Sequence, residues 1–155
     1  FTEPFIVVVP AARKKEFEKI DLIQMAQRAP FIRFSARSHF GAMIERHLRR
    51  VGHTPLPSLE IDSADIVMAM VAAGLGWSIT TPLCVLQGRA WLGQVAALPL
   101  PGPPLSRTIH QLSREGEYED MAGTFFQASR KVLDDEIFPA IRGHIPWLRN
   151  SIALC

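Results

Sequence analysis

LEIDSADIVMAMVAAGLGWSITTP, at residues 59–82, is the stretch of sequence that decides the fold. Residues 59–61 predict a short strand. Asp62 or Ser63 is placed to cap the helix that follows, because short polar side chains satisfy the free N–H groups of a first helical turn. Gly74 predicts the end of that helix, since glycine adopts the left-handed conformation that closes helices. A strand followed by a capped helix is typical of an α/β unit.

The same stretch continues into a second strand. Residues 76–80 predict that strand, and Pro82 predicts a turn or a short helix after it. No charged residue occurs from Ile66 to Gly88, which is long enough to span a membrane. We favour a buried helix, a glycine stop and a buried strand, because backbone breaks inside lipid leave polar groups unsatisfied.

Upstream, the pattern predicts two strands and two helices. Residues 4–9 are a continuous apolar run that predicts a buried central strand, and residues 31–34 predict a second strand. Between them, residues 19–28 predict a short helix with Ile20, Ile23 and Leu22 facing inward. Ser38 predicts the N-cap of the next helix, which Gly52 ends. The inner face of that helix carries Phe40, Ile44, Leu48 and Val51.

Downstream, strands are predicted at 95–100 and 108–112, on either side of the Pro-Gly-Pro-Pro break at 101–104. The last clear helix is predicted over 117–136. Strands that alternate with helices favour an α/β fold with largely parallel strands. One side of the last helix carries Met121, Phe125, Phe126, Ser129 and Leu133.

The composition is that of an ordinary globular chain. Its 155 residues, 48% apolar and 21% charged, suffice for one sizeable core or two small lobes. A formal net charge of +2 is too small to argue for nucleic-acid binding by these residues. Cys84 and Cys155 form no disulfide framework, so a reducing, cytoplasmic location is predicted. The chain has neither an initiator methionine nor a signal peptide, and we expect it to be a piece of a longer protein.

A series of short motifs resembles the effector-binding domain of LysR-type bacterial transcription regulators. Residues 3–10 are similar to the crossover strand of that domain. Residues 98–101, followed by 107–109, are similar to the strand by which the chain returns to the first lobe. No single motif is specific, but their order and spacing are, and the resemblance covers residues 3–134. The central motifs are Pro30-Phe31-Ile32-Arg33-Phe34-Ser35, Ser38-x-x-Gly41, Leu48-Arg49-Arg50-x-Gly52, Glu60-x-Asp62-Ser63 and Val71-Ala72-Ala73-Gly74-Leu75-Gly76-Trp77.

This resemblance implies a fold and a division of the chain. The family's domain has an α/β, periplasmic-binding-protein-like (type 2) fold, in which two lobes are joined by crossover strands and a small effector lies between them. By resemblance, residues 1–8 are the end of the first lobe and a hinge strand, and residues 9–106 are a complete second lobe. Residues 107–136 are then the return strand and a helix of the first lobe, which is only partly present. Residues 137–155 are a variable C-terminal tail.

The candidate effector site begins at Ser38, His39 and Phe40. These residues join a strand end to a helix start, and open α/β sheets bind ligands beyond the carboxyl ends of their strands. The N–H groups of a helix start favour an anion, to which Ser38 adds a hydroxyl, His39 a titratable group and Phe40 an apolar wall. By resemblance, Ser63 and Ala64 at the next such junction also approach the effector. The alternative is structural, with Ser38 as a cap alone and Phe40 as core.

Other candidates are better explained by structure. Core packing is favoured for Trp77 over an aromatic wall of the site. Asp62 and Asp65 are favoured as acidic residues near a helix N-terminus. A solvated helix face is favoured over a phosphate site for the basic cluster of Arg46, Arg49 and Arg50.

Catalytic and metal-binding patterns are not recognisable. Residues 76–80 begin like a nucleophile elbow but lack its closing glycine, and Cys84 has no histidine close in sequence. The five histidines show no metal-ligand spacing. We therefore expect no enzymatic activity, no metal and no cofactor.

The resemblance also implies partners. They are a small-molecule effector, for which a small organic anion is a candidate, and further copies of the chain in a homodimer or homotetramer. DNA would be bound only through a winged helix-turn-helix that this sequence lacks, and no membrane is involved. Two alternatives remain open, a solute-binding lobe of a transport-type binding protein and an unrelated small α/β enzyme.

Overall fold

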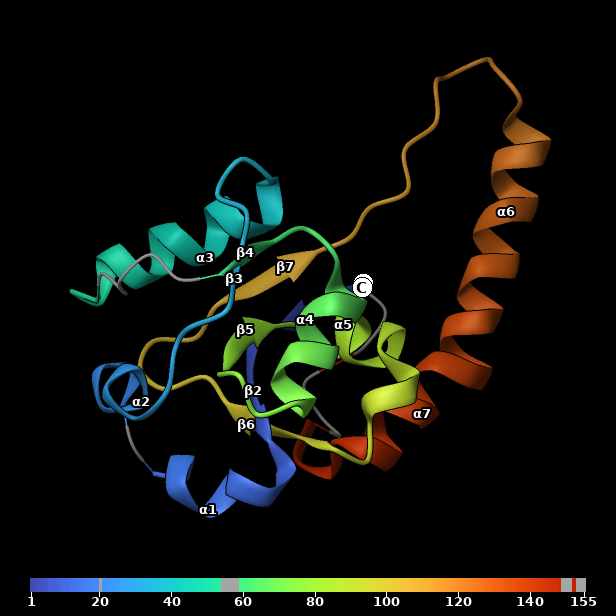
Figure 1. The fold of residues 1–155 in the computed structure, drawn as a ribbon. Helices are drawn as coiled ribbons and strands as arrows, with labels where there is room; N and C mark the ends of the chain where they lie inside the picture. The colour runs from blue at the N-terminus through green and yellow to red at the C-terminus, as the bar shows by residue number, and fades with distance from the viewer. Residues whose placement is uncertain (20, 54–58, 149–151, 153–155) are drawn as a thin grey trace. The chain divides into compact units, whose positions relative to one another are not determined.

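The computed structural model describes residues 1–19, 21–53, 59–148 and 152. The chain divides into two compact units: unit 1 comprises Phe1–Pro4 and Ser106–Cys155, and unit 2 comprises Phe5–Leu105. The chain therefore passes between the units twice, after Pro4 and after Leu105. Figure 1 shows the helices and strands of both units.

A three-stranded antiparallel sheet forms the centre of unit 2. Strand β2 (Ile6–Pro10) lies between β5 (Ser78–Thr80) and β6 (Val95–Pro99), and all five of its residues are buried. The buried central strand is therefore confirmed, but the expectation of largely parallel strands is wrong for this sheet. The Phe5 amide donates to the Leu105 carbonyl at 2.8 Å, so the chain enters and leaves unit 2 at the same end. The entering strand β2 and the leaving strand β6 must then run in opposite directions.

A second, parallel pair of strands in unit 2 carries two helices. Strand β3 (Arg33–Phe34) pairs with β4 (Glu60–Ile61). Helix α3 (His39–Arg50) follows β3, and α4 (Ala64–Ala72) follows β4. The remaining elements of unit 2 are η1 (Ala11–Arg13), α1 (Lys14–Phe17), α2 (Leu22–Arg28), α5 (Pro82–Gln87) and η2 (Arg89–Trp91).

Helix α2 begins at a capping box. The Asp21 carboxylate accepts from the Gln24 amide at 2.8 Å, and the Gln24 side chain accepts from the Asp21 amide at 3.3 Å. This start places Leu22 and Met25 in the core and leaves Ile23 50% exposed, because residues three apart share a helix face. The inward orientation expected for Ile23 is therefore wrong, and Ile20 lies outside the described residues.

Trp77 belongs to the core of unit 2, as expected. Its side chain is fully buried, and its Nε1 donates to the Ala29 carbonyl at 3.1 Å. Its ring lies 4.7 Å from that of Phe31. A Cβ at Gly76 would lie 2.2 Å from the Pro30 carbonyl oxygen, so glycine is required where these segments approach each other.

Unit 1 is built on a short ribbon and a long helical segment. Strand β1 (Thr2–Pro4) pairs antiparallel with β7 (Ser106–Thr108). The predicted strand at 108–112 is thus largely wrong, because β7 is Ser106–Thr108 and shares only Thr108 with it. Helix α6 (Glu119–Val132) continues through a π-helical turn, η3 (Leu133–Ile137), into α7 (Phe138–His144), and η4 (Pro146–Leu148) follows.

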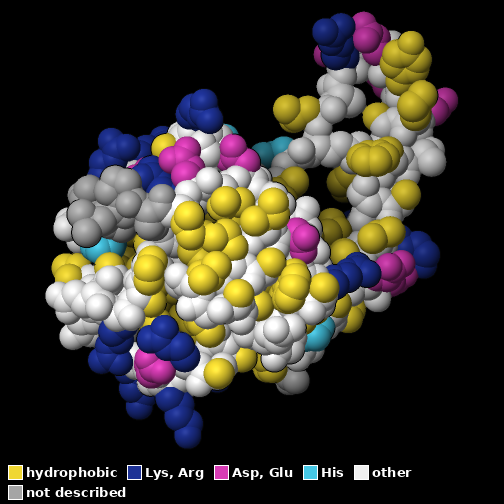
Figure 2. Space-filling model, in the orientation of Figure 1, with side chains coloured by type: hydrophobic (Ala, Val, Ile, Leu, Met, Phe, Trp, Pro, Cys, Tyr) yellow, Lys and Arg dark blue, Asp and Glu magenta, His cyan; other side chains and the backbone are white. Residues whose placement is uncertain are grey.

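Helix α6 is where predicted, but its apolar side is not covered. No residue of α6 is buried, and Met121, Phe125 and Phe126 are 64%, 63% and 48% exposed. Figure 2 shows apolar side chains along this helix at the surface. The core of unit 1 lies instead at α7, where Phe138 is buried and meets the Phe1 ring edge to face at 5.7 Å. Within the described ranges, no helix is both long and apolar enough to cross a membrane.

Candidate functional site

The first junction of the predicted site is a tight turn that ends in the cap of α3. The Ser38 Oγ accepts from the Gly41 amide at 3.0 Å and donates to the Ser35 carbonyl at 2.8 Å. A Cβ at Gly41 would lie 2.1 Å from the Ser35 oxygen. The predicted N-cap is confirmed, and the spacing Ser38-x-x-Gly41 follows from the contact of the first helical turn with the preceding loop.

The second junction has the same construction. Ser63 is the N-cap of α4, and its Oγ accepts from the Ile66 amide at 3.5 Å. Asp65 lies in the first turn, where a negative charge is favourable. Of the two residues considered for this cap, Ser63 fills the position and Asp62 precedes it.

The register of β3 and β4 brings the two junctions to one edge of the sheet. The strands are parallel, with Phe34 opposite Ile61. The segments that follow them therefore leave the sheet on the same side, where each begins a helix. His39 is exposed there, while Ser38, Phe40, Ser63 and Ala64 are half-buried. All five predicted residues therefore occupy the starts of two helices that follow neighbouring strands.

An ion-pair cluster fixes this edge. The Arg33 guanidinium on β3 lies 2.9 Å from the Glu45 carboxylate on α3 and 3.8 Å from that of Glu60 on β4. The Arg33 and Glu45 side chains are only 18% and 14% exposed. Arg33 thus connects β3 both to the helix that follows it and to the neighbouring strand. This role was not predicted from the sequence.

Phe40 contributes to the core as well as to the site. Its ring stacks on Phe5 at 5.1 Å and meets Phe34 edge to face at 4.7 Å. Phe5 and Phe34 are buried, which leaves Phe40 as the half-buried member of the trio. The pairing with Phe5 could not be predicted from the sequence, since no local pattern links residues so far apart along the chain.

A buried ion pair on the connecting ribbon was also missed. The Glu3 side chain is fully buried, and its Oε1 accepts from the Arg107 Nε at 2.7 Å. These residues are direct cross-strand partners on β1 and β7. The sequence carried one signal for this ion pair. Glu3 and Arg107 have opposite charges, and both lie in segments that were expected to be crossover strands.

The outer part of α3 is basic. Arg46, Arg49 and Arg50 are exposed, as predicted for a solvated face. Next to them, burial lowers the pKa of His47, and the Arg50 charge lowers it further. A hollow of about 450 Å³ lies at this part of the helix, beside Met43, Arg46, His47 and Leu105, away from the predicted residues at the helix start. Among the described residues, no three His, Cys, Asp or Glu side chains converge as a metal site.

Comparison with known proteins places these features in a family. Residues 1–134 match the family described as LysR substrate binding domain. The structure superposes on the effector binding domain of QuiR in complex with shikimate, with a TM-score of 0.62 and 21% sequence identity, over 82% of this chain and 59% of that one. For the regulatory domain of Synechocystis PCC6803 CcmR in complex with 2-PG, the TM-score is 0.63 and the identity 17%, over 88% and 65% of the two chains.

A full-length relative is also similar. The structure of full-length CbnR complexed with its target DNA gives a TM-score of 0.61 at 19% identity, over 87% of this chain and 47% of that one. The chain thus spans less than two thirds of each of these proteins. No curated protein sequence matches it. The shared fold is the periplasmic-binding-protein-like type 2 fold, which confirms the expectation from sequence.

Proposed function

Because the chain belongs to the LysR substrate-binding domain family, we propose that it is the effector-sensing domain of a transcription regulator and not an enzyme. The observation that carries this proposal is the parallel register of β3 and β4, which sets two serine-capped helix starts at one sheet edge. Ligands of open α/β sheets bind beyond the carboxyl ends of the strands. The proposed site comprises Ser38, His39, Phe40, Ser63 and Ala64.

The effector is a small organic anion. The first turns of α3 and α4 present N–H groups and the positive ends of two helix dipoles, which favour negative charge. The Ser38 Oγ accepts from the Gly41 amide and donates to the Ser35 carbonyl. A serine hydroxyl has one hydrogen to donate, so on binding an anion it turns from the Ser35 carbonyl to the ligand. Phe40 supplies the apolar wall, backed by Phe5 and Phe34.

Signalling follows from a shift of population. The domain has two arrangements in equilibrium, and the effector binds one of them more tightly. The change in the free-energy difference between these arrangements cannot exceed the difference between their binding free energies for the effector. We propose that the domain acts as a homodimer or homotetramer in the cytoplasm. It controls transcription through a winged helix-turn-helix outside these 155 residues.

A thermal-shift screen of small carboxylates and phosphates, with shikimate and 2-PG included, tests the site. A stabilising compound should lose its effect in Ser38→Gly, because glycine keeps most of the capping stability but removes the hydroxyl. Asp21→Gly is the control, since it also replaces a capping side chain by glycine, at the N-cap of α2. Stabilisation that survives in Ser38→Gly removes Ser38 from the site, and a screen without any stabilising anion contradicts anion sensing.

A further inference from the structure

The hollow on the outer part of α3 is lined by positive charge. Its volume is about 450 Å³, which is within the range of sites for small molecules. Met43, Arg46, His47 and Arg50 line it from the helix, and Leu105 lines it from the last residue of unit 2. All five residues belong to unit 2, so the hollow needs no residue of unit 1 to form it.

The two arginines of this hollow have no carboxylate to neutralise them. Among the described residues, neither Arg46 nor Arg50 forms an ion pair. The Glu45 carboxylate, next to Arg46 in sequence, is paired with Arg33 instead. Residues four apart are neighbours on the helix surface, with Cβ atoms about 6 Å from each other, and like charges at this spacing destabilise the helix. An anion that both guanidinium groups contact would remove this repulsion.

The dipole of α3 accounts for only part of this charge. His47, Arg49 and Arg50 lie in the last turn, where the negative end of the helix dipole favours cations. This effect falls off within one turn, and Arg46 lies before the last turn. The positive charge around the hollow therefore exceeds what the helix end stabilises.

His47 adds a buried hydrogen-bond donor. It is 2% exposed, and its Nδ1 lies 3.4 Å from the Arg50 Nη2. A guanidinium nitrogen can only donate, so Nδ1 accepts, and the proton of the neutral ring is on Nε2. That Nε2 has no partner among the described residues, and a buried donor without an acceptor is costly. An oxygen of a bound anion would supply the acceptor.

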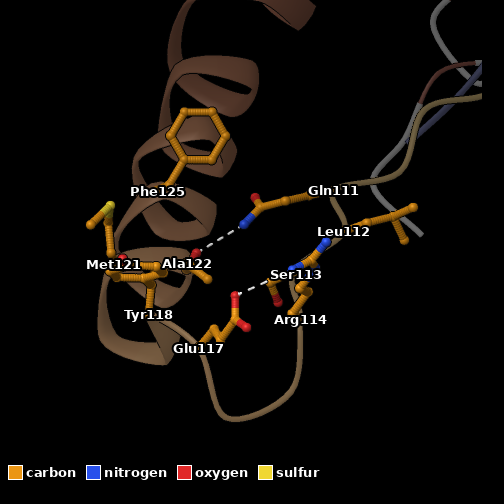
Figure 3. A pocket seen from close by; sticks show the side chains of 9 residues that line it. All are labelled: Gln111, Leu112, Ser113, Arg114, Glu117, Tyr118, Met121, Ala122 and Phe125. Atoms are coloured by element: carbon orange, nitrogen blue, oxygen red, sulfur yellow. Dashed lines mark hydrogen bonds and ion pairs between the residues drawn. The ribbon is translucent and has the colours of Figure 1, made fainter.

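A hollow of similar size in unit 1 does not have this excess of charge. Figure 3 shows it between α6 and the segment that precedes the helix, and its volume is about 460 Å³. Its charged lining residues are Arg114 and Glu117, whose side chains form an ion pair at 3.8 Å. The carboxylate neutralises the arginine in that hollow, whereas the arginines on α3 remain available to a ligand.

We propose that the hollow on α3 is a second ligand site, which binds a small dianion, either an organic phosphate or a dicarboxylate. Arg46 and Arg50 bind its charged oxygens, because the N–H groups of a guanidinium match the geometry of both kinds of anion. The His47 Nε2 donates to a further oxygen, and Met43 and Leu105 contact the apolar part of the ligand. This site shares no residue with the proposed effector site, so neither proposal depends on the other.

Titration of the 155-residue chain with phenyl phosphate and with phthalate tests this site, with the amide chemical shifts of the protein as the readout. Both probes carry an aromatic ring and are dianions at about pH 7.5. We expect saturable shifts at residues 43–50 and 105, and the tighter probe identifies phosphate or carboxylate as the preferred group. An anion at the proposed effector site would instead shift residues 38–41 and 63–66. Shifts confined to those residues, or no saturation at millimolar concentrations, overturn the second site.

Arginine variants separate a built site from general attraction to a basic surface. Arg46→Gln and Arg50→Gln should each weaken binding about tenfold or more, because each removes a charged hydrogen-bond donor to the anion. Arg49→Gln is the matched control, since it removes the same charge from an exposed position on the same helix but does not line the hollow. Its effect should be several-fold smaller. Equal effects of the three variants overturn the site.

A DNA duplex is the competing occupant, because basic helix faces also bind phosphodiester backbones. Phenyl phosphate should keep its affinity when a short duplex is added at an equal concentration of phosphate groups. Displacement of the probe by the duplex overturns the proposal and assigns this surface to nucleic acid.

Discussion

The Glu3 carboxylate, fully buried, lies 2.6 Å from the Arg107 guanidinium across the β1–β7 ribbon. The two residues are cross-strand partners in the segments where the chain passes between its units. A buried carboxylate is stable only when paired, because the energy lost by removing it from water must be recovered from its partner. The ion pair therefore couples the two connecting segments.

Removing one partner of this pair should be costly. Glu3→Ala is expected to lower the free energy of unfolding by about 3 kcal/mol, because it leaves the mostly buried Arg107 without its carboxylate. Thr2→Val, one position along β1 from Glu3, is the control and removes the exposed hydroxyl contact with Thr108. It should lower the free energy of unfolding by less than about 1 kcal/mol. Urea unfolding of the two variants measures both values. Equal effects would show that the ion pair has no special role.

Two glycines in helices should respond oppositely to alanine. Gly41→Ala is expected to lower the free energy of unfolding by about 3 kcal/mol or more, since the new Cβ collides with the Ser35 carbonyl oxygen. Gly123→Ala in α6 should raise it by about 0.5 to 1 kcal/mol, because a Cβ there meets nothing within 4 Å and alanine is the better helix former. Thermal unfolding compares them. A stable Gly41→Ala protein would contradict the tight turn before α3.

Acid should destabilise unit 2 through two buried histidines. Burial lowers the pKa of His47 and of His53 below the ordinary 6.5, and neither Nε2 has a hydrogen-bond partner among the described residues. The unfolded chain then takes up protons first, so stability is complete above about pH 6.5 and falls as pH drops toward the folded-state values. The variant with both His47→Gln and His53→Gln should lose stability less steeply between pH 6.5 and 5. An unchanged slope would exclude these histidines as its source.

The aromatic trio at the start of α3 should separate stability from binding. Phe40→Leu is expected to cost about 1 kcal/mol, because it keeps an apolar contact with Phe5 and Phe34 but loses the ring interactions. The loss of binding free energy for the effector should be larger than this loss of stability, since Phe40 is the half-buried wall of the proposed site. Phe31→Leu, at the buried ring beside Trp77, is the control and should change stability alone. Parallel losses in both variants would make Phe40 a core residue only.

Local signals explain what the sequence predicted correctly. Ser38, Ser63, Gly52 and Gly74 act through hydrogen bonds and dihedral angles within a few residues, and the structure has caps at the serines and positive φ at the glycines. The buried run of β2 was equally evident from its composition.

Contacts between distant segments explain what was missed. Strand direction in the central sheet depends on the entry and exit of the chain at Phe5 and Leu105, which no local pattern encodes. Residues 109–112 were predicted as strand, but the pairing that defines β7 stops at Thr108 and is not a local property of the sequence. The periodicity of α6 identified its apolar side correctly but carried no information on what covers it.

The hydrogen bond from Phe5 to Leu105 has a consequence for engineering and for evolution. Unit 2 is inserted between β1 and β7, and its first and last residues are hydrogen-bonded to each other. A segment with adjacent ends can be excised, transplanted into a loop of another protein or circularly permuted without stretching its backbone. Residues 5–105 can therefore be exchanged as one segment without a change in the path of the host chain.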